Sequence, residues 1–111
     1  MSGKFELKKS KNGQFMFNLK AGNNKVILTS ELYRDKAGAL NGIDAVKKSA
    51  VSVANYERLA SAKGQPYFVL KAANKQVVGR SELYESTSSV TRGIASVKAS
   101  APKAKVVDLT A

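Results

Sequence analysis

The amino-acid sequence repeats itself with a period of 51 residues. When residues 5–50 are aligned with residues 56–101 without a gap, 20 of the 46 aligned pairs are identical. The longest identical run is Ser-Glu-Leu-Tyr, at residues 30–33 and 81–84. A fixed period of this length indicates tandem copies of one structural unit. We therefore expect two similar units, here called repeat one (residues 1–51) and repeat two (residues 52–102).

Each repeat is expected to hold three strands followed by a helix. Apolar residues occupy every second position of the second strand, which is typical of a strand that buries one face. They are Phe15, Phe17 and Leu19 in repeat one and Phe68 and Leu70 in repeat two. The third strands are predicted at residues 25–30 and 76–81, each reached through a turn that contains Asn.

The helix of each repeat is indicated by apolar residues spaced four, three and four positions apart, which line one helical face. They are Ala39, Ile43, Val46 and Ala50, and their copies Val90, Ile94, Val97 and Ala101. Asp35 and Ser86 precede these helices as plausible N-caps. Gly42 and Gly93 lie on the apolar sides, where glycine costs about 1 kcal/mol relative to alanine. A close approach of helix to sheet explains these glycines better than a ligand site does.

A third copy of the first strand is expected at the C-terminal end. Val107-Asp108-Leu109 lies in phase with Phe5-Glu6-Leu7 and with Tyr56-Glu57-Arg58. Residues 103–111 are therefore predicted to form a closing strand near 105–109, which pairs into the sheet and buries Val107 and Leu109.

A unit of about 50 residues buries too little of its surface to be stable alone, so both repeats should share one core. We expect a single domain over residues 1–111, of the α+β class.

The composition narrows the function. The 111 residues include no Cys, His or Trp. This excludes disulfides, the common zinc sites, Cys and His nucleophiles and imidazole acid–base catalysis. We therefore expect a protein that is not an enzyme and that has no cofactor and no metal site.

The charge favours an anionic partner. The chain carries 19 Lys and Arg against 8 Asp and Glu, a net charge of +11 that is spread along the sequence. No apolar run is long enough for a membrane span or for a signal peptide, so the expected location is cytoplasmic, with no membrane partner.

These residues resemble a known family. The matching features are the paired Ser-Glu-Leu-Tyr segments, the Gly-Ile and Val-Lys pairs that follow them, and the closing Val106-Val107-Asp108-Leu109. They resemble the YegP-like family of small tandem-repeat proteins over essentially the whole chain. The resemblance implies an α+β fold of two tandem β3-α-β units that share one mainly antiparallel sheet, with both helices on one face and the terminal strands exchanged between the units. It implies no function, because that family is uncharacterised.

The Ser-Glu-Leu-Tyr segments allow two interpretations. Glu31 and Glu82 could act as paired carboxylates in acid–base catalysis, provided that they converge. The structural interpretation is that Ser30 and Ser81 satisfy backbone groups where the third strand ends. The remaining members, Leu32, Leu83, Tyr33 and Tyr84, would then pack over the crossing from strand to helix. We favour the structural interpretation.

The sheet face opposite the helices is the candidate binding surface. Strand alternation sends cations and one aromatic residue to this face. These candidate nucleic-acid-binding residues are Lys20, Lys25, Tyr67, Lys71 and Arg80. Lysine and arginine can neutralise phosphates without reading sequence, although one aromatic residue is few for stacking bases. For these cations we favour the structural interpretation, a solvated surface that keeps the protein soluble, over a nucleic-acid site.

The same face is predicted to expose apolar residues, and a large exposed apolar patch usually marks an interface. The candidates are Met16, Ile27, Tyr67, Val69 and Val78. A homodimer or a protein partner would bury them. The first hypothesis is therefore a non-enzymatic binding or protein-interaction module that uses the uncovered sheet face. Weak nucleic-acid binding without sequence preference is the second.

Overall fold

The computed structural model describes residues 3–110. Met1 and Ser2, at the start of the stretch where no signal peptide is expected, and Ala111, at the end of the predicted closing segment, lie outside the described residues. The strands are β1 (Lys4–Lys9), β2 (Phe15–Lys20), β3 (Val26–Thr29), β4 (Tyr56–Ala60), β5 (Pro66–Lys71), β6 (Val77–Arg80) and β7 (Lys105–Asp108). The helices are α1 (Lys36–Ser49) and α2 (Thr87–Ser100). Short 3-10 turns, Val53–Asn55 and Ala101–Lys103, lead into β4 and β7.

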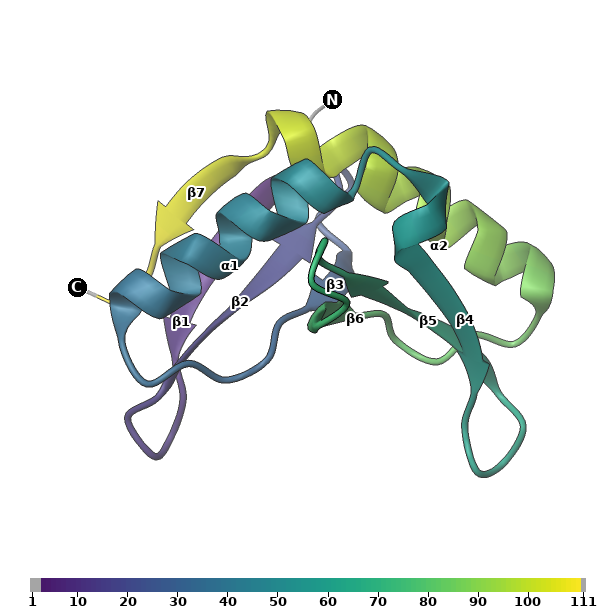
Figure 1. Cartoon of the computed structure of the whole chain (residues 1–111), viewed down its shortest axis with the longest axis horizontal. Coiled ribbons are helices and arrows are strands. Elements are labelled where there is room, and N and C mark those ends of the chain that lie inside the picture. Colours follow the sequence, from purple (N-terminus) through teal and green to yellow (C-terminus); the bar gives the residue numbers. More distant parts are fainter. Residues whose placement is uncertain (1–2, 111) are drawn as a thin grey trace.

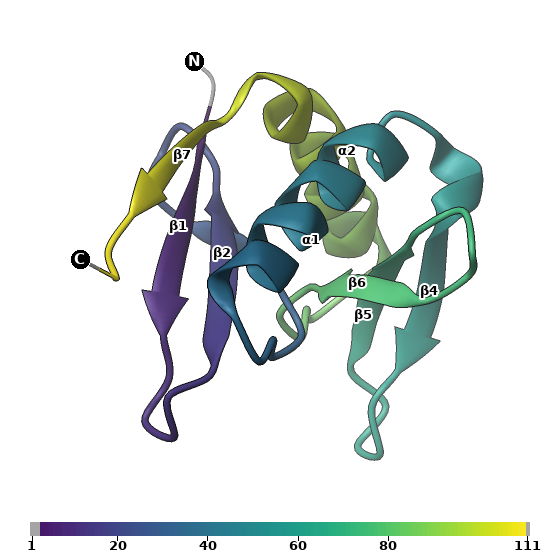
Figure 2. The same cartoon turned by 60° about the vertical axis from the view of Figure 1, so that its left-hand side comes forward.

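The strands form one sheet in the order β4-β5-β6-β3-β2-β1-β7. Neighbouring strands are antiparallel except β1 and β7, which are parallel. The halves from the two repeats meet where Thr29 of β3 pairs with Arg80 of β6. Both helices lie on the same side of the sheet (Figure 1). The predicted α+β fold class is confirmed, including the exchange that brings β7 from beyond α2 to the edge of β1 (Figure 2).

Both helices begin at the predicted N-caps. The Asp35 carboxylate accepts a hydrogen bond from the Gly38 amide at 2.7 Å, and the Ser86 hydroxyl accepts one from the Ser89 amide at 3.2 Å. These bonds satisfy amides that have no partner inside the helix. The predicted apolar faces are buried, so each helix packs its stripe against the sheet.

Each helix glycine makes room for a tyrosine. The Tyr33 ring stacks on Phe17 with ring centroids 6.3 Å apart, and Tyr84 stacks on Phe68 in the same way at 6.4 Å. A Cβ atom on Gly42 would overlap the Tyr33 hydroxyl. The close approach predicted at this glycine therefore involves the tyrosine ring as well as the sheet.

The C-terminal strand forms where it is predicted, but its burial differs from the prediction. Leu109 is 54% exposed, and Val107 is only half-buried. The repeat places Val107 in phase with Phe5, whereas the parallel pairing sets Val106 beside Phe5 and Val107 beside Glu6. The prediction that Val107 and Leu109 are buried is therefore wrong, because β7 is an added edge strand. Ala104, just before β7, is buried instead.

Candidate functional site

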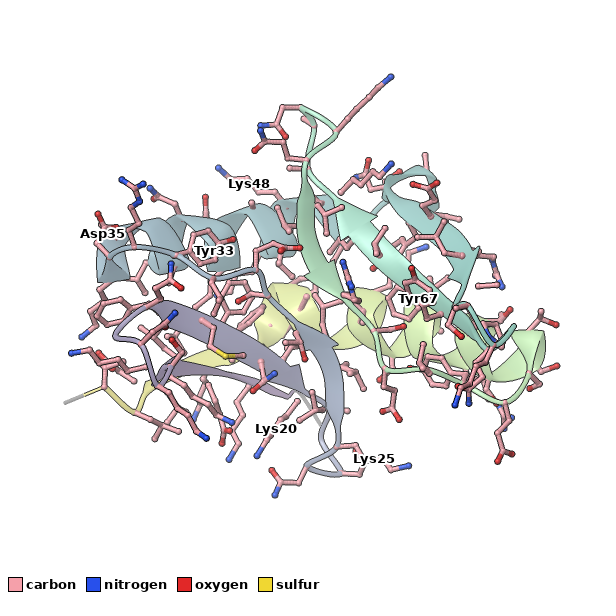
Figure 3. The ribbon with its side chains drawn as sticks, turned by 90° about the horizontal axis from the view of Figure 1, so that it is seen from below. Lys20, Lys25, Tyr33, Asp35, Lys48 and Tyr67 are labelled. Atoms are coloured by element: carbon pink, nitrogen blue, oxygen red, sulfur yellow. The ribbon has the colours of Figure 1, made fainter. Side chains whose placement is uncertain are left out.

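The sheet face opposite the helices, here called the open face, is seen from below in Figure 3. Strand pairing places a continuous row of residues across this face. Strand register links each residue of the row to the next, so all of their side chains lie on the same face of the sheet. From β7 to β4 the row consists of Val107, Glu6, Asn18, Thr29, Arg80, Val69 and Glu57.

Glu6 is the centre of a cationic cluster at one end of this row. Its carboxylate lies 3.0 Å from the Lys20 Nζ, 3.5 Å from the Lys4 Nζ and 3.7 Å from the Lys8 Nζ. The hydrogen bond from Lys20 is the main cause that lowers the pKa of Glu6, while burial acts in the opposite direction. The carboxylate therefore stays ionised and neutralises part of the positive charge.

The sequence contained a signal for this cluster that the motif analysis missed. Lys4, Glu6 and Lys8 stand at alternate positions of β1, so the pleat places all three on one face. Register with β2 then brings Lys20 opposite Lys4. A search for charges spaced two apart within a predicted strand would have found the cluster.

The corresponding place in repeat two is much simpler. Glu57, the copy of Glu6, forms an ion pair with Lys71. Its side chain is 46% exposed, against 11% for Glu6. Asn55 and Leu59 stand where repeat one has Lys4 and Lys8, so the two ends of the open face differ in charge.

Arg80 is the exposed cation at the middle of the open face, opposite Thr29. Both residues line a shallow pocket of about 390 Å³, together with Ser30, Glu31 and Ser81. The guanidinium has five N–H donors and suits a planar or tetrahedral oxyanion. The Glu31 carboxylate in the same pocket opposes an anion there.

The two serine hydroxyl groups of this pocket are already used by the backbone, and the Thr29 hydroxyl accepts a hydrogen bond from the Asn18 side-chain amide at 3.0 Å. Ser30 Oγ accepts the Phe17 amide at 2.9 Å and donates to the Glu31 carbonyl at 2.7 Å. Ser81 makes the equivalent bonds with Phe68 and Glu82. The structural interpretation of these serines is correct, but the companion residues Leu32 and Leu83 are exposed rather than packed.

The five candidate nucleic-acid residues do not form one site: four lie on the open face, whereas Lys25 lines a hollow beside Ser89 and Arg92 of α2, so its assignment to the open face is wrong. Lys20 and the exposed Lys25 lie toward the turn between β2 and β3, and Tyr67 lies on β5 at some distance from them (Figure 3). Lys71 also lies on β5, and Arg80 is central. Tyr67 is half-buried, which leaves part of its ring accessible.

The predicted exposed apolar patch is wrong for three of its five members. Ile27, Val69 and Val78 are exposed by only 7%, 3% and 7%. The β2–β3 and β5–β6 registers shift beside Ile27 and Val78, and such bulges break the alternation on which the prediction rests. Both side chains join the core as a result.

The other two candidates of the predicted apolar patch keep some exposure. Val69 is buried for a different reason from Ile27 and Val78. Val69 pairs with Glu57 and Arg80, whose longer side chains flank it. Met16 and Tyr67 are half-buried. The open face is therefore mainly polar and cationic.

Two further features of the described residues bear on function. Neither α1 nor α2 has the length and hydropathy that crossing a bilayer requires. Within residues 3–110, no three acidic side chains gather in a way that could hold a metal ion.

Comparison with known proteins identifies close relatives. A family model described as a domain of unknown function (DUF1508) matches twice, at residues 10–57 and 61–108. A UPF0339 protein of Acinetobacter baylyi is 53% identical over 99% of both chains. A UPF0339 protein of Pasteurella multocida is 51% identical over 97% of this chain and 95% of its own.

Two solved structures are similar over nearly the whole chain. The solution NMR structure of a UPF0339 protein from Shewanella oneidensis has a TM-score of 0.92 and 49% identity, covering 99% of this chain and 93% of its own. The solution NMR structure of the E. coli protein of unknown function yegP has a TM-score of 0.94 and 47% identity, covering 99% and 95%.

Proposed function

Because this chain belongs to the DUF1508 family, whose relatives here are uncharacterised, we propose its function from its surface. We propose a non-enzymatic module that binds the phosphate backbone of nucleic acid through the open face, without reading base sequence. The supporting observation is the charge of that face. Strand register assigns to it the cations Lys4, Lys8, Lys20, Lys71, Arg80 and Lys105, against the carboxylates Glu6 and Glu57.

The arrangement of these cations favours backbone contacts over base recognition. They lie on several adjacent strands, which are about 4.8 Å apart, so a bound strand could meet successive cations. Among the open-face residues named above, Tyr67 is the one aromatic side chain, and it is half-buried. Sequence-specific single-strand binders usually stack several bases, so affinity here would come from counterion release.

The buried apolar candidates weigh against a protein interface on this same face. Three of them lie beneath the surface, so little apolar area remains to be gained there by association. A non-enzymatic role is supported by the absence of Cys and His from the sequence.

Binding of fluorescently labelled single- and double-stranded 20-mers tests the proposal. Affinity should fall with rising salt, with a slope of about 0.9 in log K against log salt for each phosphate contact on a duplex. Arg80→Glu should weaken binding and reduce the slope. Lys98→Glu, which makes the same change of charge on α2, is the matched control.

The outcome separates a defined face from general cationic attraction. Equal losses for Arg80→Glu and Lys98→Glu would show that net charge alone is responsible. No detectable binding at about 50 mM salt, where electrostatic affinity is strong, would reject nucleic acid as the ligand.

A further inference from the structure

The two repeats differ at the outer edges of their first strands. β1 pairs with β2 on one side and β7 on the other, whereas its copy β4 pairs with β5 alone. Both edges can be followed in Figure 2, where β7 runs beside β1 and no described strand runs beyond β4. An uncovered strand edge presents backbone donors and acceptors that can pair with another chain.

β7 shows what such an edge binds in this molecule. It runs parallel to β1, and the Leu109 amide donates to the Leu7 carbonyl at 2.8 Å. The Asp108 carboxylate forms an ion pair with Lys36 at the start of α1. Strand pairing and one carboxylate therefore fix β7 between the sheet edge and the helix.

Arg58 occupies on β4 the position that Leu7 occupies on β1, one period earlier. Its pairing partner is Phe68. The Phe68 amide donates to the Ser81 hydroxyl and the Phe68 carbonyl accepts from the Ser81 amide, both on the side of β6. In an antiparallel pair this alternation turns the backbone N–H and C=O of Arg58 away from β5. The backbone of Arg58 therefore faces outward, as that of Leu7 does.

Two hollows accompany the β4 edge. One, of about 650 Å³, is lined by the start of the strand and by Asn55, Lys71 and Lys75. The other, of about 400 Å³, lies between the end of β4 and the start of α2 and includes Pro66 and Val90. Repeat one carries β7 along the corresponding edge.

We propose that the outer edge of β4 binds an extended segment of a partner protein by parallel strand addition, in the register that β7 uses on β1. In that register, the residue matching Asp108 stands opposite Arg58. The Arg58 guanidinium donates one hydrogen bond to the Thr91 hydroxyl at 3.0 Å and retains further donors. The segment should therefore carry a carboxylate there, preceded two residues earlier by an apolar side chain, as in Val106-Val107-Asp108.

A second copy of this chain fits the edge less well. The β7 of a second copy is already paired with its own β1. An antiparallel pairing of two β4 strands centred on Glu57 or Arg58 would place like charges side by side, which is unfavourable. Charge complementarity with Arg58 therefore favours a foreign segment that carries a carboxylate opposite this residue.

A labelled peptide with the sequence of residues 104–110 is the probe, titrated into the full chain. Saturable anisotropy is expected, with amide shifts in NMR spectra confined to β4, the β4–β5 hairpin and the start of α2. Arg58→Glu should weaken binding at least about tenfold, because a charge-assisted contact becomes repulsive. A peptide carrying Asp108→Lys should regain affinity for that variant.

Arg92→Glu is the matched control, since it makes the same charge change at an exposed position of α2. It should leave peptide binding within about twofold of the wild type. The proposal is overturned if the shifts fall on β1, which would mean that the peptide displaces β7. Unchanged affinity in Arg58→Glu, absence of saturation by about 1 mM, or concentration-dependent dimerisation through β4 in sedimentation would overturn it equally.

Discussion

The hydroxyl group of Tyr33 fills the space that a side chain at Gly42 would need. A Cβ built on Gly42 would also lie 2.7 Å from Tyr33 Cζ and 3.1 Å from Phe17 Cε2. Tyr84 and Gly93 repeat this relationship one period later. The packing of the tyrosine between strand and helix therefore offsets the unfavourable helix propensity of glycine.

Gly42→Ala should lower the free energy of unfolding by about 1 to 3 kcal/mol, although alanine is the better helix former. Gly38→Ala in the same helix is the control. There the nearest atom to a new Cβ is the Asp35 Oδ1 that accepts the Gly38 amide, at 3.1 Å, and the next is Tyr33 Cδ1 at 3.4 Å, so the space is far less crowded than at Gly42. Urea unfolding should place this control within about 0.5 kcal/mol of the wild type. Adding Tyr33→Phe should relieve part of the Gly42→Ala loss, and equal stability of both glycine variants would contradict the packing argument.

Glu6 and Glu57 are copies in different surroundings, which allows an internal comparison. Glu6→Gln should destabilise the protein by about 1 to 3 kcal/mol, because three lysines lose their nearly buried common partner. Glu57→Gln should cost less than about 1 kcal/mol, because its single ion pair is exposed. Thermal and urea unfolding of both variants decide the matter. A larger loss in Glu57→Gln would show that the cluster is not stabilising.

Asp108 makes stability depend on pH in the acid range. A hydrogen bond from Lys36, followed by those from the Thr110 hydroxyl and amide, lowers the pKa of Asp108 from 3.8 to about 2. The ionised form stabilises the fold above pH 3.8, and this contribution is lost as the pH falls toward about 2. In Asp108→Asn the free energy of unfolding should depend less on pH in this range than it does in the wild type. A carbon-detected NMR titration of the wild type should give the low pKa of Asp108 directly.

Asp44→Asn is a suitable control, since it removes an exposed ion pair with Lys48 and leaves Asp108 intact. Its stability should retain the wild-type pH dependence between pH 4 and 2. A wild-type slope in Asp108→Asn would mean that the interaction with Lys36 does not stabilise the fold.

The repeat predicts equivalence between residues but not how strands pair. Seven strands and both helices follow from periods of 51, 2 and about 3.6 residues, whereas the exchange of β7 was expected from the resemblance to the YegP-like family. The burial of Val107 does not, because parallel pairing with β1 is offset by one residue from the repeat. That register is fixed by the contact between β1 and β7, two strands that are distant in the sequence.

The candidate site shows the same limit. Alternation assigns Arg80 to the open face, where it pairs with Thr29, but alternation fails for Ile27 because the register shifts after Leu19. A bulge depends on cross-strand packing, which no local pattern reveals. The alternation of Lys4, Glu6 and Lys8, by contrast, is readable from β1 alone, and Lys20 joins the cluster through the pairing of β1 with β2.

Leu28 and Gly79 stand one period apart and share a single space where the two halves of the sheet meet. A Cβ on Gly79 would lie 2.5 Å from Leu28 Cδ2 and 2.6 Å from Leu28 Cγ. Leu28 is 1% exposed, so its side chain has no room to move aside. The approximate twofold relation between the repeats therefore leaves room for one leucine, which repeat one supplies.

Exchange of these two residues tests whether the space is truly shared. Leu28→Gly alone should cost about 3 to 5 kcal/mol by leaving a cavity, and Gly79→Leu alone should overpack the core by a comparable amount. The double variant should recover at least half of the summed loss, because the core that holds Leu28 also contains identical residues at equivalent positions of the two repeats, such as Phe17 with Phe68 and Ile43 with Ile94. Urea unfolding of the four proteins gives the coupling energy. A double variant whose loss equals the sum of the single losses would mean that Leu28 and Gly79 fill separate spaces and that the repeats do not substitute for each other in the core.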